Sequence, residues 1–146
     1  MNPKFQRSPM PRSSSNYRSG LERDFAQGVI GWEFKFEPFM LPYVIHREYK
    51  PDFVHSDSGI IVECKGFFRT GDTQKYKAIR DSINKYNELI FILSDPRKKV
   101  RKGSDITMGK WCEKEGFRYF TLSQLDEFLA YVDNASKKKR KKSARL

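Results

Sequence analysis

A short hairpin with charged residues at its open end is the feature that most constrains this sequence. Apolar residues in segments 53–54 and 60–62 predict two strands, and the polar segment 56–59 predicts the turn between them. A hairpin centred on that turn places Asp52 directly opposite Glu63. Partners in such a pair share one face of the sheet, with their Cβ atoms roughly 5 Å apart.

The charges on this hairpin indicate a divalent-metal site that hydrolyses phosphodiesters. Two facing carboxylates repel each other unless a cation lies between them, and hard oxygen ligands suit Mg²⁺. Lys65 is two residues beyond Glu63 and therefore points to the same face, whereas Cys64 points to the other face and is expected to pack into the core. The apolar flanks predict that both strands are central, where charged side chains need a functional reason. The alternative is an ordinary exposed edge, because such short patterns also occur without catalysis.

Length and composition favour one domain with a modest core. The 146 residues are 38% hydrophobic and 14% aromatic, which is enough for a single core. No apolar run is long enough to span a membrane, and the first residues do not resemble a signal peptide, so a cytoplasmic protein without membrane contact is expected. Cys64 and Cys112 have no Cys-x-x-Cys spacing, and His46 and His55 are interpreted as incidental rather than as metal ligands.

The net charge of +11 is concentrated at the two ends of the chain. Residues 1–20 contain four basic side chains and residues 137–146 contain seven, with no acidic side chain in either segment, so the remainder is neutral. Both ends are poor in apolar residues. We therefore predict a flexible basic arm at 1–17, a catalytic domain at 18–134 and a disordered basic tail at 135–146.

The two basic ends favour contact with a polyanion. If they neutralise roughly six phosphates, affinity for a nucleic acid falls on the order of a thousandfold between low and physiological salt. This binding would not depend on base sequence. Lysine-rich ends that only maintain solubility, or a nuclear localisation signal, are the alternatives.

Hydrophobic periodicity predicts an α/β fold with a central mixed sheet flanked by helices. One expected helix begins near Ser19, a second is capped by Asp72 or Thr73, and a third begins at Met108. The last begins after Thr121, whose spacing to Gln124 matches a capping box. Alternation predicts a strand at 32–36, an apolar run predicts a strand covered on both faces at 89–93, and an edge strand is expected at 117–120. The buried stripe of the second helix is predicted to contain Tyr76, Ile79, Ile83 and Tyr86; that of the last helix, Leu122, Leu125, Phe128, Leu129 and Val132.

Several segments, taken in order, resemble the bacteriophage endonuclease I family of Holliday-junction resolvases. The resemblance runs from about Arg18 to Gly116, and its order of elements is that of the restriction-endonuclease-like core. The link from Ile45 to Tyr49 is shorter than expected for the family. The matching segments are Arg18-Ser19-Gly20-Leu21-Glu22, Pro42-Tyr43-Val44-Ile45, Tyr49-x-Pro51-Asp52-Phe53, Gly59-Ile60-x-Val62-Glu63-x-Lys65-Gly66, Lys102-Gly103-Ser104 and Cys112-Glu113-Lys114-x-Gly116.

The resemblance implies a metal-dependent DNA endonuclease that resolves four-way junctions and other branched DNA by paired nicks. It implies 5′-phosphate and 3′-hydroxyl ends, and a homodimer whose subunits exchange N-terminal elements. The implied catalytic residues are Glu22, Asp52, Glu63 and Lys65. The implied ligands of one or two Mg²⁺ ions, with Mn²⁺ as a substitute, are the three carboxylates and the backbone carbonyl of Cys64. By itself, the spacing of Ser19 and Glu22 favours a capping box, which explains Glu22 without catalysis.

Basic residues in the predicted second helix and in the loop after strand 89–93 are candidates for contact with the DNA backbone. A solvated surface is the alternative for each of them. Two other functions stay open: a sequence-specific restriction or mismatch-repair nuclease, and a DNA-binding module without catalysis. The candidates are Lys75, Lys77, Arg80, Lys85, Arg97, Lys98, Lys99, Arg101 and Lys102.

Overall fold

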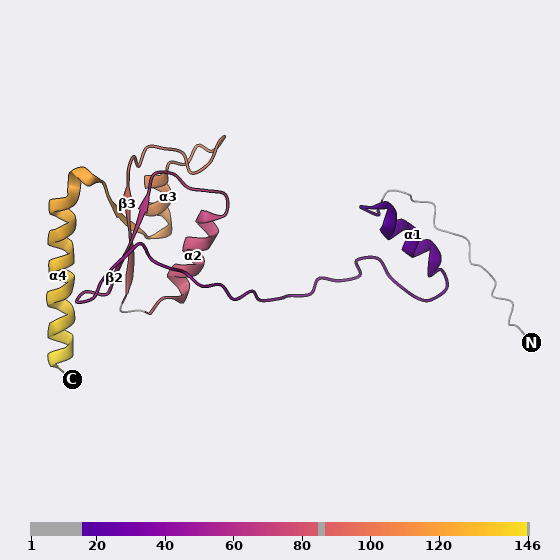
Figure 1. The fold of residues 1–146 in the computed structure, drawn as a ribbon, viewed down its shortest axis with the longest axis horizontal. Coiled ribbons are helices and arrows are strands. Elements are labelled where there is room, and N and C mark those ends of the chain that lie inside the picture. Colours follow the sequence, from indigo (N-terminus) through magenta and orange to yellow (C-terminus); the bar gives the residue numbers. More distant parts are fainter. Residues whose placement is uncertain (1–15, 85–86, 146) are drawn as a thin grey trace, which may run out of the picture. The chain divides into compact units, whose positions relative to one another are not determined.

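The protein forms two compact units, which divide between His46 and Arg47. We describe residues 16–84 and 87–145 of a computed structural model (Figure 1). Each unit is described by itself. Within the described residues, no helix has both the length and the apolar character needed to cross a membrane.

The described part of the first unit, residues 16–46, contains one helix followed by irregular chain. Helix α1 (Gly20–Gly28) begins near Ser19 as predicted, because Ser19 is its N-cap and forms a capping box with Glu22. The predicted strand at 32–36 is wrong, because residues 29–46 contain no strand. The left-handed backbone of Glu33 (φ 59°) interrupts the extended conformation, and residues 16–46 contain no strand that could pair with its backbone groups.

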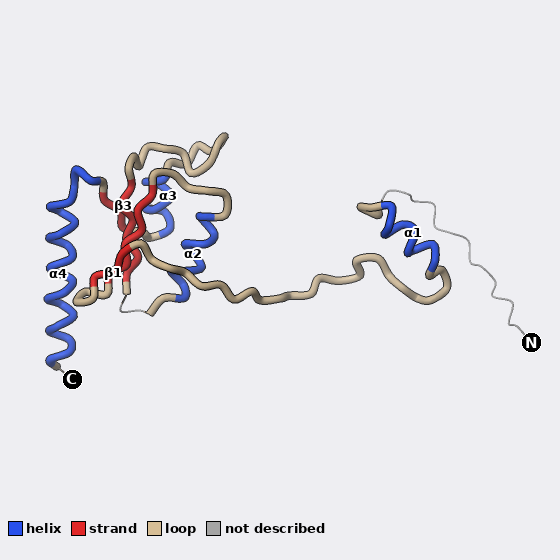
Figure 2. The backbone as a smooth tube through the Cα atoms, viewed as in Figure 1, coloured by secondary structure: helices blue, strands red, loops and turns tan. Residues whose placement is uncertain are grey.

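The second unit is built on a four-stranded mixed sheet in the order β1-β2-β3-β4 (Figure 2). Strand β1 (Phe53–His55) is antiparallel to β2 (Ile60–Lys65), which is parallel to β3 (Glu88–Leu93); β3 is in turn parallel to β4 (Arg118–Phe120). The predicted hairpin register is confirmed, since Phe53 pairs with Val62 and the next position places Asp52 beside Glu63. The confirmed class is therefore α/β, with a mixed sheet flanked by helices.

Helices cover both faces of this sheet. Helices α2 (Asp72–Ser82) and α3 (Met108–Glu115) connect the parallel strands, and a 3₁₀ turn (Leu122–Gln124) leads into α4 (Leu125–Ala144). The α2 face has a core that includes Tyr76, Phe91 and Trp111. The α4 face has a smaller core around Ile60, Val62 and Val132. Strand β3 contributes to both cores, which confirms that it is covered on both faces.

Strand β1 and Cys64 are more exposed than the sequence predicts. Strand β1 lies at the edge of the sheet, so the expectation that both hairpin strands are central is wrong. Its residues Phe53 and Val54 are exposed. Cys64 does point away from Glu63, but it is exposed rather than packed into the core. The core on the α4 face includes Ile60 and Val62 of this strand and does not extend to Cys64.

The C-terminal segment is helical, which corrects the expectation of a disordered tail at 135–146. Helix α4 continues to Ala144, and the described part of the segment ends at Arg145. The helix contains neither proline nor glycine, and Lys141 and Lys142 in its last turn interact favourably with the helix dipole. In its predicted buried stripe, Leu122, Leu125 and Leu129 are exposed, whereas Val132 is buried.

Helix α2 begins one residue earlier than predicted. Its N-cap is Gly71, whose left-handed backbone (φ 88°) favours glycine, and not Asp72 or Thr73. Tyr76 is buried as predicted, and Ile79 and Ile83 are partly buried, while Tyr86 lies outside the described residues.

Candidate active site

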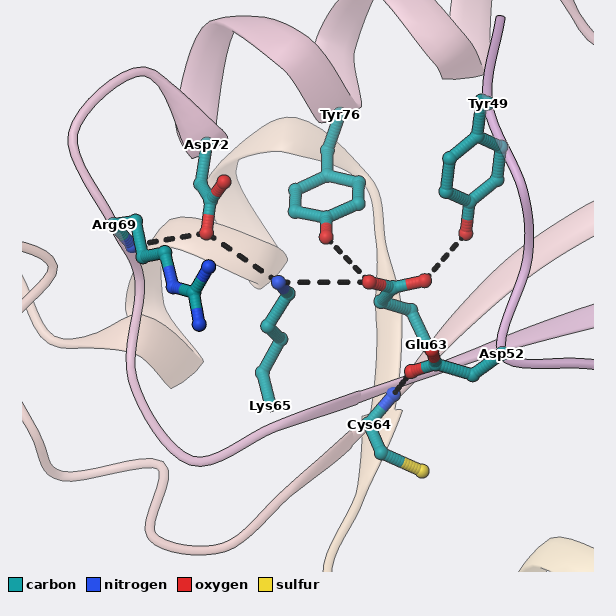
Figure 3. Close-up of polar contacts among 8 residues, drawn as sticks. All are labelled: Tyr49, Asp52, Glu63, Cys64, Lys65, Arg69, Asp72 and Tyr76. Carbon is teal, nitrogen blue, oxygen red and sulfur yellow. Dashed lines mark hydrogen bonds and ion pairs between the residues drawn. The ribbon is translucent and has the colours of Figure 1, made fainter.

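Strand β2 places Glu63 and Lys65 on the face of the sheet that α2 covers. Their spacing of two residues in a strand gives them the same orientation. Glu63 is only 5% exposed, and each of its carboxylate oxygens accepts a hydrogen bond from a tyrosine (Figure 3). The hydroxyl of Tyr49 donates to Oε2 and that of Tyr76 to Oε1, both at 2.6 Å. A buried carboxylate is thus held in one orientation.

Lys65 lies between two buried carboxylates. Its Nζ is 3.5 Å from Oε1 of Glu63 and 3.4 Å from Oδ2 of Asp72. Asp72 is 7% exposed, and its Oδ2 also accepts a hydrogen bond from the backbone N–H of Arg69 at 2.9 Å. The ammonium group therefore balances two negative charges that would be costly to bury alone. Sequence reasoning treated Asp72 only as a possible helix cap and gave no signal of this contact.

Asp52 is fixed beside these groups by the backbone of β2. It is exposed and precedes β1 by one residue, and its Oδ2 accepts a hydrogen bond from the N–H of Cys64 at 2.9 Å. This bond joins the carboxylate to the residue between Glu63 and Lys65. The pKa of the Cys64 thiol is raised, first by partial desolvation and then by the negative charges of Asp52 and Glu63. Asp52, Glu63 and Lys65 are brought together as the sequence predicts.

Tyr49 and Tyr76 remain hydrogen-bond donors throughout the neutral range. Burial is the main cause that raises the pKa of each phenol far above its usual value, and the hydrogen bond and charge of Glu63 add to it. The ammonium group of Lys75 lies over both rings, 5.6 Å from the centroid of Tyr49 and 5.1 Å from that of Tyr76. The sequence predicted Tyr76 only as part of the buried stripe of a helix. The helical period of 3.6 residues does not show which group a tyrosine hydroxyl contacts.

We expect Tyr76→Phe to lower the free energy of unfolding by about 2 kcal/mol at neutral pH, because a buried hydrogen bond to a charged carboxylate is lost. The raised pKa of Tyr76 means that its contribution is present at neutral pH and is lost as the pH rises above the usual tyrosine value of about 10. The difference between wild type and variant should therefore shrink in alkali. Thermal unfolding between about pH 8 and pH 11 measures this change.

The control for this prediction is Tyr43→Phe, since Tyr43 is exposed. It should leave the unfolding curve unchanged at every pH. A Tyr76→Phe protein whose stability deficit is the same at neutral and alkaline pH would contradict the proposed role of the phenol proton.

The donor set beside Lys65 fits a hard divalent cation. The described residues contain no group of three or more histidine, cysteine, aspartate or glutamate side chains that is arranged to hold a metal. Asp52 and Glu63 instead offer two neighbouring carboxylates, and Oδ2 of Asp52 and Oε2 of Glu63 each accept one hydrogen bond, which leaves a second lone pair on each oxygen. Mg²⁺ is commonly held by one or two carboxylates, with water and substrate phosphate completing its coordination.

Comparison with known proteins connects this geometry to a family. The family model described as phage endonuclease I matches residues 4–142, which is nearly the whole chain. The chain belongs to the phage endonuclease I family. It is 34% identical over 113 residues to Endonuclease I of Escherichia phage T7, which covers 74% of each chain. It is also 34% identical over 108 residues to Endodeoxyribonuclease 1 of Enterobacteria phage T3, which covers 70% of each chain.

Glu22, the fourth candidate that the phage endonuclease I resemblance implies, lies in the first unit. Its Oε2 accepts hydrogen bonds from the backbone N–H groups of Arg18 at 2.7 Å and Ser19 at 3.0 Å. Its own N–H donates to the hydroxyl of Ser19 at 3.2 Å. The carboxylate therefore forms the capping box expected from its spacing, while Asp52, Glu63 and Lys65 lie in the second unit.

The basic candidates differ in how firmly the rest of the protein holds them. Arg80 is fixed between α2 and α3, since it donates to the backbone carbonyl of Glu115 at 2.6 Å. Lys98 donates to the carbonyl of Gly66 at 2.9 Å, which places the basic loop next to the end of β2. Lys99 donates to the carbonyl of Asp105, and Arg97 pairs with Asp95. The remaining described candidates are Lys75, Lys77, Arg101 and Lys102, while Lys85 lies outside the described residues.

Proposed function

We propose that this protein is a metal-dependent DNA endonuclease that resolves four-way junctions by paired nicks. The observation that supports this proposal most directly is that Asp52, Glu63 and Lys65 lie together at the end of β2. The printed names of its relatives describe an endonuclease and an endodeoxyribonuclease, which supports DNA as the substrate. The expected products carry 5′-phosphate and 3′-hydroxyl ends.

In this proposal the carboxylates bind the metal and Lys65 acts on the scissile phosphate or on the attacking water. Asp52, Glu63 and the backbone carbonyl of Cys64 would bind Mg²⁺, or Mn²⁺ in its place, and Glu22 would help to hold a second ion. When bound, the cation supplies Lewis-acid polarisation of the phosphodiester and acidifies a bound water. Lys65 orients that water or donates to the phosphate oxygen on which negative charge grows. Asp72 and Glu63 keep the ammonium group directed into the site.

Selectivity for branched DNA would come from a homodimer whose subunits exchange N-terminal elements. The dimer is supported by the exposed apolar surface of the first unit, in which none of residues 16–46 is buried. An exposed apolar surface of this extent is rarely left in water and marks an interaction site. The large exposed side chains of this unit are Leu21, Phe25, Ile30, Trp32, Phe34, Phe36, Phe39, Met40, Leu41, Tyr43, Val44 and Ile45.

The same exchange bears on the restriction-endonuclease-like core that the resemblance implies. That core has a further strand before the hairpin, and segment 32–36 has the apolar alternation for it. We propose that this segment pairs with a sheet only in the dimer. The exposed edge strand β1 has backbone groups free to accept such a partner.

A cleavage assay tests this function directly. With Mg²⁺, an immobile four-way junction should be nicked in pairs beside the branch, while a linear duplex with the same arm sequences should stay intact. EDTA should abolish cleavage and leave junction binding, which a gel-shift assay measures, largely unchanged.

Other outcomes would identify another function. Cleavage of the linear duplex at one sequence would indicate a sequence-specific nuclease. A junction that is bound but never cut would indicate a binding protein, and full activity in EDTA would contradict the metal-dependent mechanism.

A further inference from the structure

The C-terminal half of α4 carries a dense positive charge on a rigid element. The basic residues between Lys137 and Arg145 extend beyond Ser136, the last buried residue of the helix. Lys137 pairs with Asp133 at 2.8 Å, and Arg140 pairs with Asp57 at 3.2 Å. The others form no ion pair with any described residue. The unpaired group is Lys138, Lys139, Lys141, Lys142 and Arg145.

The contact between Arg140 and Asp57 fixes where this charge lies. Asp57 belongs to the turn between β1 and β2, so the basic end of α4 lies beside the start of β2. Lys65 is at the other end of that strand. Five residue steps of about 3.3 Å separate Ile60 from Lys65, which is roughly 16 Å along the strand.

The basic end of α4 also lies on the other side of the sheet from the carboxylates. Val132 and the core around it cover Ile60 and Val62, whereas Glu63 and Lys65 point toward α2. Figure 1 shows α4 and α2 on opposite sides of the sheet. The basic end of α4 and the side chains of Glu63 and Lys65 therefore lie on different faces of the sheet.

Like charges along the helix indicate an anionic ligand. Lys138 and Lys142 are four residues apart on one side of the helix, and such like-charge pairs destabilise a helix. Neither lysine pairs with an acidic side chain among the described residues, so the repulsion is not compensated within them. A row of phosphates would relieve it.

We propose that the basic end of α4 is a second binding site for the DNA backbone, separate from the active site, that holds a part of the branched substrate remote from the cut phosphate. This proposal deepens the proposed function and rests on it. The ligand is a duplex phosphate backbone, which the site recognises by charge and without reading bases. The two sites on opposite sides of one sheet favour a substrate whose arms diverge.

The test compares two double variants of the full-length protein. In Lys138→Gln/Lys142→Gln, two charges are removed from α4; in the control Lys110→Gln/Lys114→Gln, two exposed charges with the same spacing are removed from α3. Glutamine has nearly the helix propensity of lysine, so both helices should persist, which circular dichroism verifies. Both variants lose the same net charge.

We expect the α4 variant to bind a long-armed junction on the order of tenfold more weakly, with a log–log salt slope reduced by about two. Hydroxyl-radical footprinting should show that protection is lost remote from the branch and kept at the cut positions. Its kcat at saturating junction should stay within about twofold of wild type, while KM rises.

Three results would overturn the proposal. These are an unchanged salt slope, an equal loss in the α3 control, or a loss of protection confined to the cut positions. Tighter binding to RNA or to anionic vesicles than to junction DNA, abolished by the α4 substitutions, would assign the surface to another anion. Binding and footprinting do not require turnover, so an inactive nuclease would contradict the proposed function without deciding the role of α4.

Discussion

Asp52→Asn is expected to slow junction cleavage by at least about a thousandfold, which corresponds to about 4 kcal/mol of transition-state stabilisation. Asparagine keeps an oxygen that can accept the hydrogen bond from the N–H of Cys64, so the local backbone should be preserved. It removes the negative charge that a divalent cation requires. Single-turnover cleavage of a labelled junction measures the rate, and gel shift measures the affinity, which should stay within about twofold.

The matched control is Asp126→Asn, at an exposed carboxylate in the first turn of α4. The change has the same size and charge but lies away from the site, so cleavage should remain at the wild-type rate. If Asp52→Asn cuts junctions at the wild-type rate, Asp52 is not a metal ligand. If it fails to bind junctions, its carboxylate serves binding and not the chemical step.

Two inactive variants are expected to restore activity when they are mixed. Glu22→Gln and Asp52→Asn should each abolish cleavage in the proposed dimer, where Glu22 of one subunit completes the site of the other. After random exchange of subunits, half of the dimers are mixed and each has one intact site, so about a quarter of the sites recover. Because only one site is intact in each mixed dimer, single nicks should replace paired nicks.

The design separates catalysis from folding. Glutamine can occupy the same position of a capping box as glutamate, so Glu22→Gln should keep the start of α1. The control mixture is Asp52→Asn with Glu63→Gln, whose two positions lie in the same unit, and it should show no recovery. If the first mixture also stays inactive although mixed dimers form, then Glu22 acts within its own subunit. If Glu22→Gln alone cuts junctions at the wild-type rate, then Glu22 only caps α1.

The sequence by itself determined the local geometry of the hairpin. The turn at 56–59 and the period of two along a strand are properties of neighbouring residues, so they fix that Asp52 lies beside Glu63 and that Lys65 shares its face. The same local rules located β3 and the capping boxes of Ser19 and Thr121. The family resemblance rested on the hairpin, the start of α1 and other short segments up to Gly116, and the match over residues 4–142 confirms it.

Only the tertiary structure decided which groups surround the carboxylates and which surfaces are covered. Tyr76 and Asp72 reach Glu63 and Lys65 because α2 packs across β2, and Tyr49 reaches Glu63 from the segment that precedes β1. Cys64 is exposed because the core under α4 ends before it, and residues 135–144 are helical because they extend a packed helix. Local patterns encode the direction of a side chain, but its burial and its partners depend on elements brought together from elsewhere in the chain.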